Sequence, residues 1–183
     1  MARHLGDYGN VTVMEVNGNY NEYNVDGTIN AVPRQVIAKE FFRTHNDDYD
    51  FLVIFTNFDF TITSDTVAFY LQVKNDIRGI GLDIFDNSDL YGSAGKLQGT
   101  IDMGNIAKIA SDPLSPDFEF TLETLSHEML HRWGAYVKFK DQAGTISTAL
   151  LGKDDAHWSF LLDTKGSLEY GNPYKAPVCQ GQK

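Results

Sequence analysis

Residues 127–131 read His127-Glu128-Met129-Leu130-His131, and this short stretch influences the predicted fold more than any other. Two histidines four positions apart on an α-helix lie one above the other on the same face. Their imidazoles can therefore share one metal ion, and Glu128 can reach a water molecule beside it. Zinc lowers the pKa of such a water towards about 7, so that a carboxylate can accept its proton as it attacks a carbonyl. The stretch predicts His127 and His131 as zinc ligands and Glu128 as general base.

The residues around this motif predict a helix that begins near Thr121, as its N-cap, and runs to about Gly134 or Val137. Apolar side chains recur along it at spacings of three and four residues, on the side expected to face the core opposite the histidines. They are Leu122, Leu125, Met129, Trp133 and Tyr136. The competing interpretation is a helix with surface histidines, because a five-residue motif also occurs by accident.

A catalytic zinc needs a third protein ligand and one open position. The chain has 5 histidines. His4 lies in the terminal region and His45 lies upstream of the motif, which leaves His157 as the favoured third ligand. In that case Asp154 or Asp155 could accept the other ring N–H and orient the imidazole; the alternative is that both belong to a solvated turn.

The remaining sequence predicts alternating helices and strands. A strand at 11–16 followed by the turn Asn17-Gly18 indicates a hairpin or extended arm over residues 1–30. Residues 31–183 are then expected to form one domain. Within it, the sequence predicts a helix at 33–45 that begins with Pro33, further strands and a loop at 79–95. The predicted strands lie at 50–57, 66–73, 97–103, 158–163 and 167–170.

With its motif helix and this order of elements, the chain resembles the zincin clan of metallopeptidases. The resemblance in the strict sense covers residues 127–131. It implies an α+β, zincin-like fold with a mixed twisted sheet, a backing helix and an active-site helix, with the cleft below an edge strand. The chain is also similar to uncharacterised bacterial proteins that share Tyr-Gly-Ser-Ala-Gly, here residues 91–95, and His-Trp-Ser-Phe, here residues 157–160. This similarity implies a secreted or extracytoplasmic location.

The clan's subtypes differ in their third zinc ligand, and this leaves alternatives to His157. The metzincin subtype is excluded, because its third histidine would fall at Val137. In the gluzincin pattern a downstream glutamate binds the ion, and Glu169 would serve. In the aspzincin pattern an aspartate binds it, and Asp154 or Asp155 would serve.

Composition and charge limit the partners. The formal net charge is −10, from 15 Lys and Arg against 25 Asp and Glu, and no basic cluster is present, so a nucleic-acid partner is excluded. No apolar run reaches the length of a membrane span. The single cysteine, Cys179, cannot form an internal disulfide. Because neither end resembles a finished element, we expect the chain to be a segment of a longer protein.

Three weaker signals concern substrate and ions. Residues 97–103 could be an edge strand that pairs with an extended peptide, or an internal strand. Tyr136, Tyr170 or Tyr174 could stabilise an oxyanion, although packing is the default role of a tyrosine. Three aspartates in the loop at 79–95 have a spacing suited to calcium but lack the closing glutamate of an EF-hand, which favours a solvated loop. They are Asp83, Asp86 and Asp89.

The sequence therefore predicts a Zn²⁺-dependent metallopeptidase acting on a peptide or protein substrate. Two alternatives belong to other classes: a binding module that keeps the zinc-helix fold without cleaving, and a zinc hydrolase of a non-peptide amide or ester.

Overall fold

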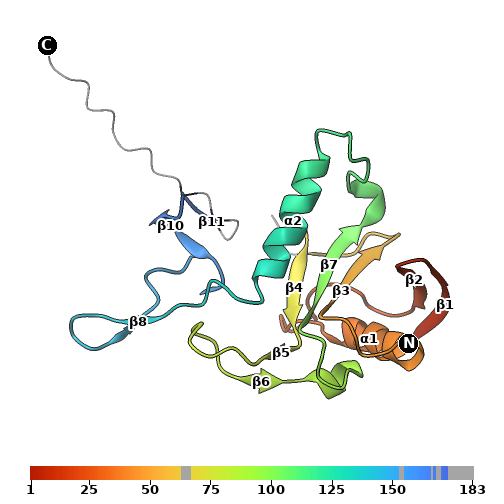
Figure 1. The fold of residues 1–183 in the computed structure, drawn as a ribbon, viewed down its shortest axis with the longest axis horizontal. Helices are drawn as coiled ribbons and strands as arrows, with labels where there is room; N and C mark the ends of the chain where they lie inside the picture. Colours follow the sequence, from red (N-terminus) through yellow and green to blue (C-terminus); the bar gives the residue numbers. More distant parts are fainter. Residues whose placement is uncertain (63–66, 153–154, 166, 168–169, 173–183) are drawn as a thin grey trace, which may run out of the picture. The chain divides into compact units, whose positions relative to one another are not determined.

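The computed structural model describes residues 1–62, 67–152, 155–165, 167 and 170–172. The chain divides into two compact units, one of Met1–Ile77 with Asp83–Arg132 and one of Arg78–Leu82 with Trp133–Lys183. The class is α+β, as predicted (Figure 1). Residues 1–30, expected to form an arm, belong to the first unit. Neither of the two helices in the described part of the chain has the length and apolar character needed to cross a lipid bilayer.

The first unit holds both helices and most strands. Its elements in chain order are β1 (Ala2–Tyr8), β2 (Val11–Val16), α1 (Val32–Thr44), β3 (Phe51–Thr56), β4 (Phe69–Gln72), β5 (Lys74–Asn75), β6 (Phe85–Asp86), η1 (Ser88–Tyr91), β7 (Gly99–Asn105), η2 (Ile106–Lys108) and α2 (Phe118–Leu130). The second unit contains β8 (Phe139–Lys140), β9 (Ile146–Ser147), β10 (Trp158–Asp163) and β11 (Tyr170–Asn172).

The largest sheet has three strands in the order β3-β7-β4. Strand β3 runs parallel to β7, and β4 runs antiparallel to it, so the sheet is mixed. Strand β7 is buried from Gly99 to Gly104. The expectation that residues 97–103 form a substrate-binding edge strand is wrong, because β3 and β4 already bond to both edges of β7. The pattern of side chains in residues 97–103 does not indicate whether the strand is central or at an edge.

The two helices of the first unit pack on opposite faces of this sheet (Figure 1). On one face, Ala38 of α1 joins a buried cluster that includes Leu52 and Leu71. On the other face, Leu125 and Met129 of α2 pack against a second cluster. That cluster is centred on Ala68, Ile101 and Met103. Each helix therefore covers part of one face of the sheet, and α2 is held on the sheet by Leu125 and Met129 in its C-terminal half.

A buried ion pair joins α1 to the centre of the sheet. The guanidinium of Arg34, 0% exposed, donates to the carboxylate of Asp102 from Nε at 3.1 Å and from Nη2 at 2.8 Å. Its Nη1 donates to the carbonyl oxygens of Tyr20, Asn21 and Asn30 at 3.0–3.4 Å. One arginine therefore neutralises a buried carboxylate and holds the segment that precedes α1.

Aromatic rings enclose this ion pair. The guanidinium carbon of Arg34 lies 3.9 Å from the ring centroid of Tyr20 and 4.9 Å from that of Phe69. The Tyr20 hydroxyl donates to Asp102 at 2.9 Å. Burial, followed by the Asp102 charge, raises the pKa of the Tyr20 hydroxyl well above its ordinary value. Tyr20 therefore stays protonated and remains a hydrogen-bond donor to the carboxylate.

The N-terminal hairpin has a different turn from the predicted one. Strands β1 and β2 pair antiparallel from Tyr8↔Val11 to Ala2↔Val16, so the turn lies at Gly9-Asn10 and not at Asn17-Gly18. Gly9 adopts φ +64°, in the left-handed region that favours glycine. Strand β1 was not predicted, because its sequence is polar and lacks the β-branched residues typical of strands.

Glu40 of α1 connects the helix to this hairpin. Its carboxylate accepts two hydrogen bonds from Arg43 and one from the backbone N–H of His4. These bonds, the Arg43 pair most of all, lower the pKa of Glu40 from 4.5 to about 2. In the unfolded chain the group titrates near its ordinary value. Its stabilising effect is thus fully present above about pH 4.5 and is lost as the pH falls through about 2.

We expect Glu40→Gln to weaken the attachment of β1 to α1 at pH 5 but not at pH 2. The measurement is amide hydrogen exchange at His4, compared between variant and wild type at each pH. Glu15→Gln is the control, because the Glu15 carboxylate pairs with Arg3 inside the hairpin at 2.6 Å. Equal exchange of the His4 amide in Glu40→Gln and wild type at pH 5 would contradict this role.

Candidate metal centre

The motif lies at the C-terminal end of α2. The helix spans Phe118–Leu130, so His127 is in its last turn, and His131 is the C-cap with helical angles, φ −56° and ψ −12°. The predicted helix is therefore confirmed through the motif, but its ends differ. The N-cap is Asp117 and not Thr121, whose hydroxyl instead donates to the carbonyl of Ala110 at 3.1 Å.

The predicted apolar stripe is confirmed only in its central part. Leu125 and Met129 pack against the sheet, whereas Leu122 is 48% exposed. Trp133 and Tyr136 lie beyond the end of the helix. Two packed residues suffice to fix the rotation of α2 about its axis. The face with the histidines is turned away from the sheet, because positions 127 and 131 are out of phase with 125 and 129.

The two motif histidines are close neighbours. Their ring centroids lie 4.8 Å apart, with the ring planes at 84°. His131 is 8% exposed and Glu128 is 6% exposed. The C-terminal end of a helix has a partial negative charge, which stabilises a cation beside the last turn. The position of the pair at this end of α2 therefore suits a bound metal ion electrostatically.

The three predicted ligands are divided between the two units. His127 and His131 lie at the end of α2 in the first unit, and His157 directly precedes β10 in the second. His131 and His157 are buried and His127 is half-buried. The pair on α2 is therefore the part of the predicted site that the first unit forms by itself, and His157 stays the predicted third ligand.

The donor set fits zinc. Zinc takes imidazole nitrogens at about 2.0–2.1 Å in tetrahedral sites, and three histidines with one open position form a known catalytic ligand set. The predicted ligands His127, His131 and His157 form a set of this kind, and Glu128 is the carboxylate predicted to act beside the ion.

The other candidates for the third ligand stay open. Asp155 belongs to the second unit and adopts φ 52°. Asp154 and Glu169 lie outside the described residues, as do Tyr174 and Cys179. The choice between His157 and Glu169 therefore stays a prediction, and zinc stoichiometry can decide it.

The aspartates considered for calcium make local hydrogen bonds instead. Asp86 accepts from the backbone N–H of Ser88 at 2.9 Å, and Asp89 accepts from that of Leu90 at 2.9 Å. With Asp83 they form no metal-ligand group among the described residues. The region predicted as a loop at 79–95 contains the short strand β6 and the 3₁₀ helix η1.

Two residues beside the motif were missed by the sequence analysis. Gln72 of β4 donates from Nε2 to the carbonyl oxygen of His131 at 3.2 Å. Arg132, the residue after the motif, is 3% exposed. The sequence did mark Arg132, because it is a charged residue directly after His131 in an otherwise uncharged flank. Gln72 had no such signal, because its partner is 59 positions away.

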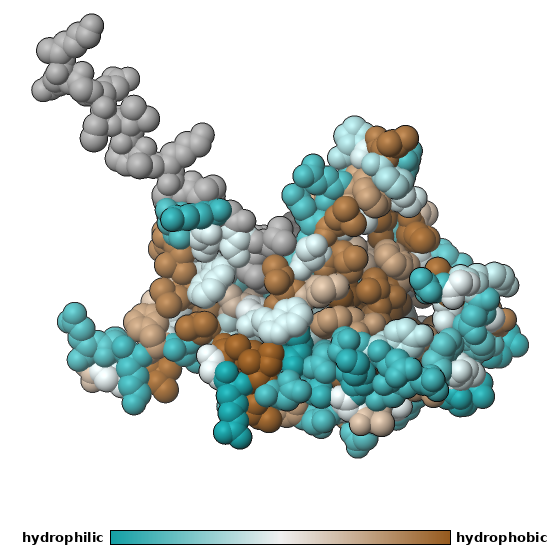
Figure 2. All heavy atoms as spheres, viewed as in Figure 1, coloured by the Kyte–Doolittle hydropathy of each residue, from teal (hydrophilic) through white to brown (hydrophobic). Residues whose placement is uncertain are grey.

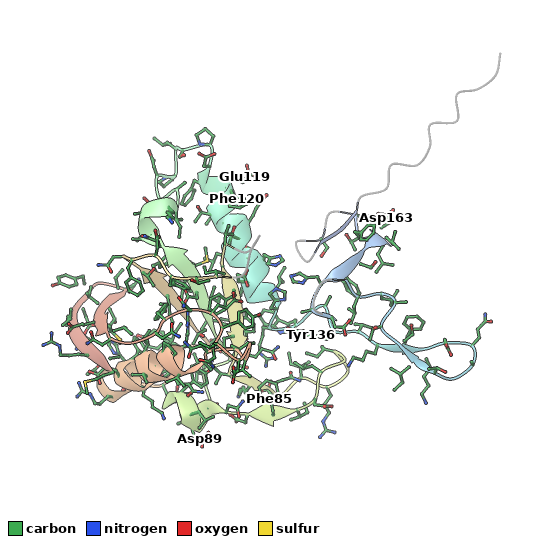
Figure 3. The ribbon with its side chains drawn as sticks, turned by 180° about the vertical axis from the view of Figure 1, so that it is seen from behind. Phe85, Asp89, Glu119, Phe120, Tyr136 and Asp163 are labelled. Atoms are coloured by element: carbon green, nitrogen blue, oxygen red, sulfur yellow. The ribbon has the colours of Figure 1, made fainter. Side chains whose placement is uncertain are left out.

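A cavity of about 600 Å³ lies beside the N-terminal half of α2. Its lining includes Phe120, Thr121 and Thr124, together with Met103 and Ile109. Positions 120, 124, 127 and 131 follow one another at spacings of three and four, so the cavity and the histidines share one face of the helix. Glu119 and Phe120 mark this N-terminal end in Figure 3. Figure 2 shows apolar side chains gathered over α2 and the neighbouring strands of the sheet.

Comparison with known protein families, with curated proteins and with solved structures gave no match to this chain. The candidate metal centre is therefore interpreted from its own residues and geometry.

Proposed function

We propose that this chain is a zinc-dependent metallopeptidase that hydrolyses peptide bonds, with His127, His131 and His157 as the zinc ligands and Glu128 as the general base. The observation that supports this best is the pair of imidazoles one turn apart at the end of α2, with the buried Glu128 between them in the sequence. Imidazole nitrogens bind several transition metals, and the tetrahedral set of three with an open position favours zinc.

Zinc bound there supplies Lewis acidity towards water and towards the carbonyl of the scissile peptide bond. Glu128 accepts a proton at its carboxylate as the water oxygen attacks the carbonyl carbon. It then transfers that proton to the amide nitrogen as the C–N bond breaks, so the amine leaves neutral. The low exposure of Glu128, 6%, shields this proton from bulk water during the transfer.

The proposed substrate is an extended peptide. Gln72 at the end of β4 bonds to the His131 carbonyl, so the end of this strand lies next to the proposed metal-binding end of α2. The cavity along the same face of α2 can accept an apolar side chain of the peptide.

The zinc content of purified variants tests this proposal and its third ligand. We expect wild type to bind one equivalent of zinc, and His157→Ala to bind it at least about ten-fold more weakly, because loss of one ligand leaves only two. His45→Ala is the matched control, since His45 contacts Asp7 at 3.2 Å and is not one of the proposed ligands. Full zinc binding in His157→Ala combined with loss in Glu169→Ala would assign the third position to Glu169. Wild type that binds no zinc would overturn the metallopeptidase proposal.

A further inference from the structure

Arg132, the residue after His131, has every guanidinium nitrogen engaged. Nε and Nη2 donate to Oε1 of Gln98 at 2.9 and 2.7 Å. Nη1 donates to Oδ1 of Asn75 at 3.3 Å, and Nη2 also donates to Oδ1 of Asp76 at 2.6 Å. Gln98 directly precedes β7, and Asn75 ends β5. A planar, forked guanidinium thus connects the end of α2 to two other segments of the first unit.

The backbone of His131 is held on its other side by Gln72. Helices commonly end with a glycine in the left-handed region, whose N–H groups bond to the last carbonyls. Here the C-cap His131 keeps helical angles, and the side chain of Gln72 donates to its carbonyl oxygen at 3.2 Å. Helix ends otherwise fray. The side chain of Gln72 therefore adds to the backbone hydrogen bonds of the last turn, such as that from the Arg132 N–H to the Met129 carbonyl at 3.1 Å.

From these contacts we infer that Arg132 is a positioning residue for the metal centre, acting through the backbone of His131. This inference rests on the proposed function. Metal–ligand distances must fall within about 0.2 Å of their ideal values, and a ligand held in place before binding lowers the cost of ordering it. His127 lies inside the helix and is positioned by helical hydrogen bonds. His131 lies at the end, where its carbonyl oxygen accepts from the amide of Gln72 and the fork of Arg132 holds the next residue.

Arg34 provides a matched control, because it is also a buried arginine in a hydrogen-bond network. It is 0% exposed, and its hydrogen bonds go to Asp102, Tyr20, Asn21 and Asn30, none of which belongs to α2. If Arg132 had only a structural role, Arg132→Lys and Arg34→Lys would have the same effects on melting temperature and zinc affinity. Lysine keeps the charge in both variants but cannot reproduce the fork.

The experiment compares zinc dissociation constants for wild type, Arg132→Lys and Arg34→Lys, by competition with a chromophoric chelator. All binding measurements are made at a temperature at which thermal denaturation curves show that each protein is folded. We expect Arg132→Lys to bind zinc about 10–100-fold more weakly, the usual effect of losing a residue that orients a ligand. When cobalt replaces zinc, its visible absorption spectrum should also differ between Arg132→Lys and wild type. Arg34→Lys should lower the melting temperature and leave zinc affinity within about two-fold of wild type.

If Arg132→Lys does not fold, Gln72→Met tests the positioning of His131 independently. It removes the bond to the His131 carbonyl without removing a buried charge, and it should also weaken zinc binding with little change in melting temperature. Equal zinc affinity in wild type and the positioning variants would overturn the inference while leaving the metallopeptidase proposal intact. Equal weakening in Arg132→Lys and Arg34→Lys would also overturn it. Wild type without zinc affinity would overturn both proposals.

Discussion

Replacement of Glu128 by glutamine is expected to reduce peptide hydrolysis by about 10²–10⁴-fold, the range that a positioned general base contributes. Glutamine has nearly the same shape as glutamate, but its amide cannot accept a proton from water. Zinc content should stay at the wild-type level, because Glu128 is not one of the three proposed ligands. The measurement is the turnover of a fluorescent casein substrate together with metal analysis of the same samples.

Glu119→Gln is the control for this substitution. It makes the same chemical change in the same helix, in the first turn of α2, where the side chain is exposed and distant along the helix from the motif (Figure 3). Its activity should stay within about two-fold of wild type, as expected for a surface change. If Glu128→Gln retains wild-type turnover, Glu128 is not the base. If neither wild type nor variant cleaves peptides while zinc is bound, a non-cleaving binding module becomes the better description.

The substitution Asp102→Asn is expected to lower the free energy of unfolding by about 3–5 kcal/mol, the usual cost of leaving one member of a buried ion pair without its partner. Arg34 is 0% exposed and Asp102 is 1% exposed, so water cannot replace the lost charge. Asparagine preserves the volume and one acceptor oxygen, so the effect reports mainly the charge. Urea denaturation measures it as a lower midpoint at an unchanged slope.

Asp50→Asn is the matched control, because it removes the same charge from a surface pair. Asp50 lies 2.8 Å from the Lys96 ammonium, and the two side chains are 52% and 46% exposed. Exposed pairs contribute about 0–1 kcal/mol, so the expected change is several-fold smaller than for Asp102→Asn. If the two variants are destabilised equally, the Arg34–Asp102 pair does not anchor α1 to the sheet.

Sequence patterns located the elements whose signals are local. The helix at 33–45 appears as α1, and the apolar run at 50–57 appears as β3. Trp158–Asp163 matches β10 in both bounds. Each has a short-range cause: proline at the start of a helix, a period of 3.6 residues, or a continuous apolar run between turns. The i,i+4 spacing of His127 and His131 belongs to the same kind of signal.

The place of β7 in the sheet could not be read from its sequence. A buried run of residues fits an edge strand covered on one side as well as a central strand. The hydrogen bonds to β3 and β4 that decide between them join residues far apart in the chain. The pairing of Arg34 with Asp102, 68 positions away, was invisible for the same reason.

By itself, the sequence determined that His127 and His131 lie on one helical face with Glu128 between them, because helix geometry fixes the relation of positions three and four apart. Tertiary structure alone decided where α2 ends, which strand is central, and that Gln72 and Arg132 hold the backbone at His131. These features depend on contacts between residues 34–59 positions apart. Such contacts form only when hydrophobic burial has packed the helices onto the sheet, and no local pattern encodes them.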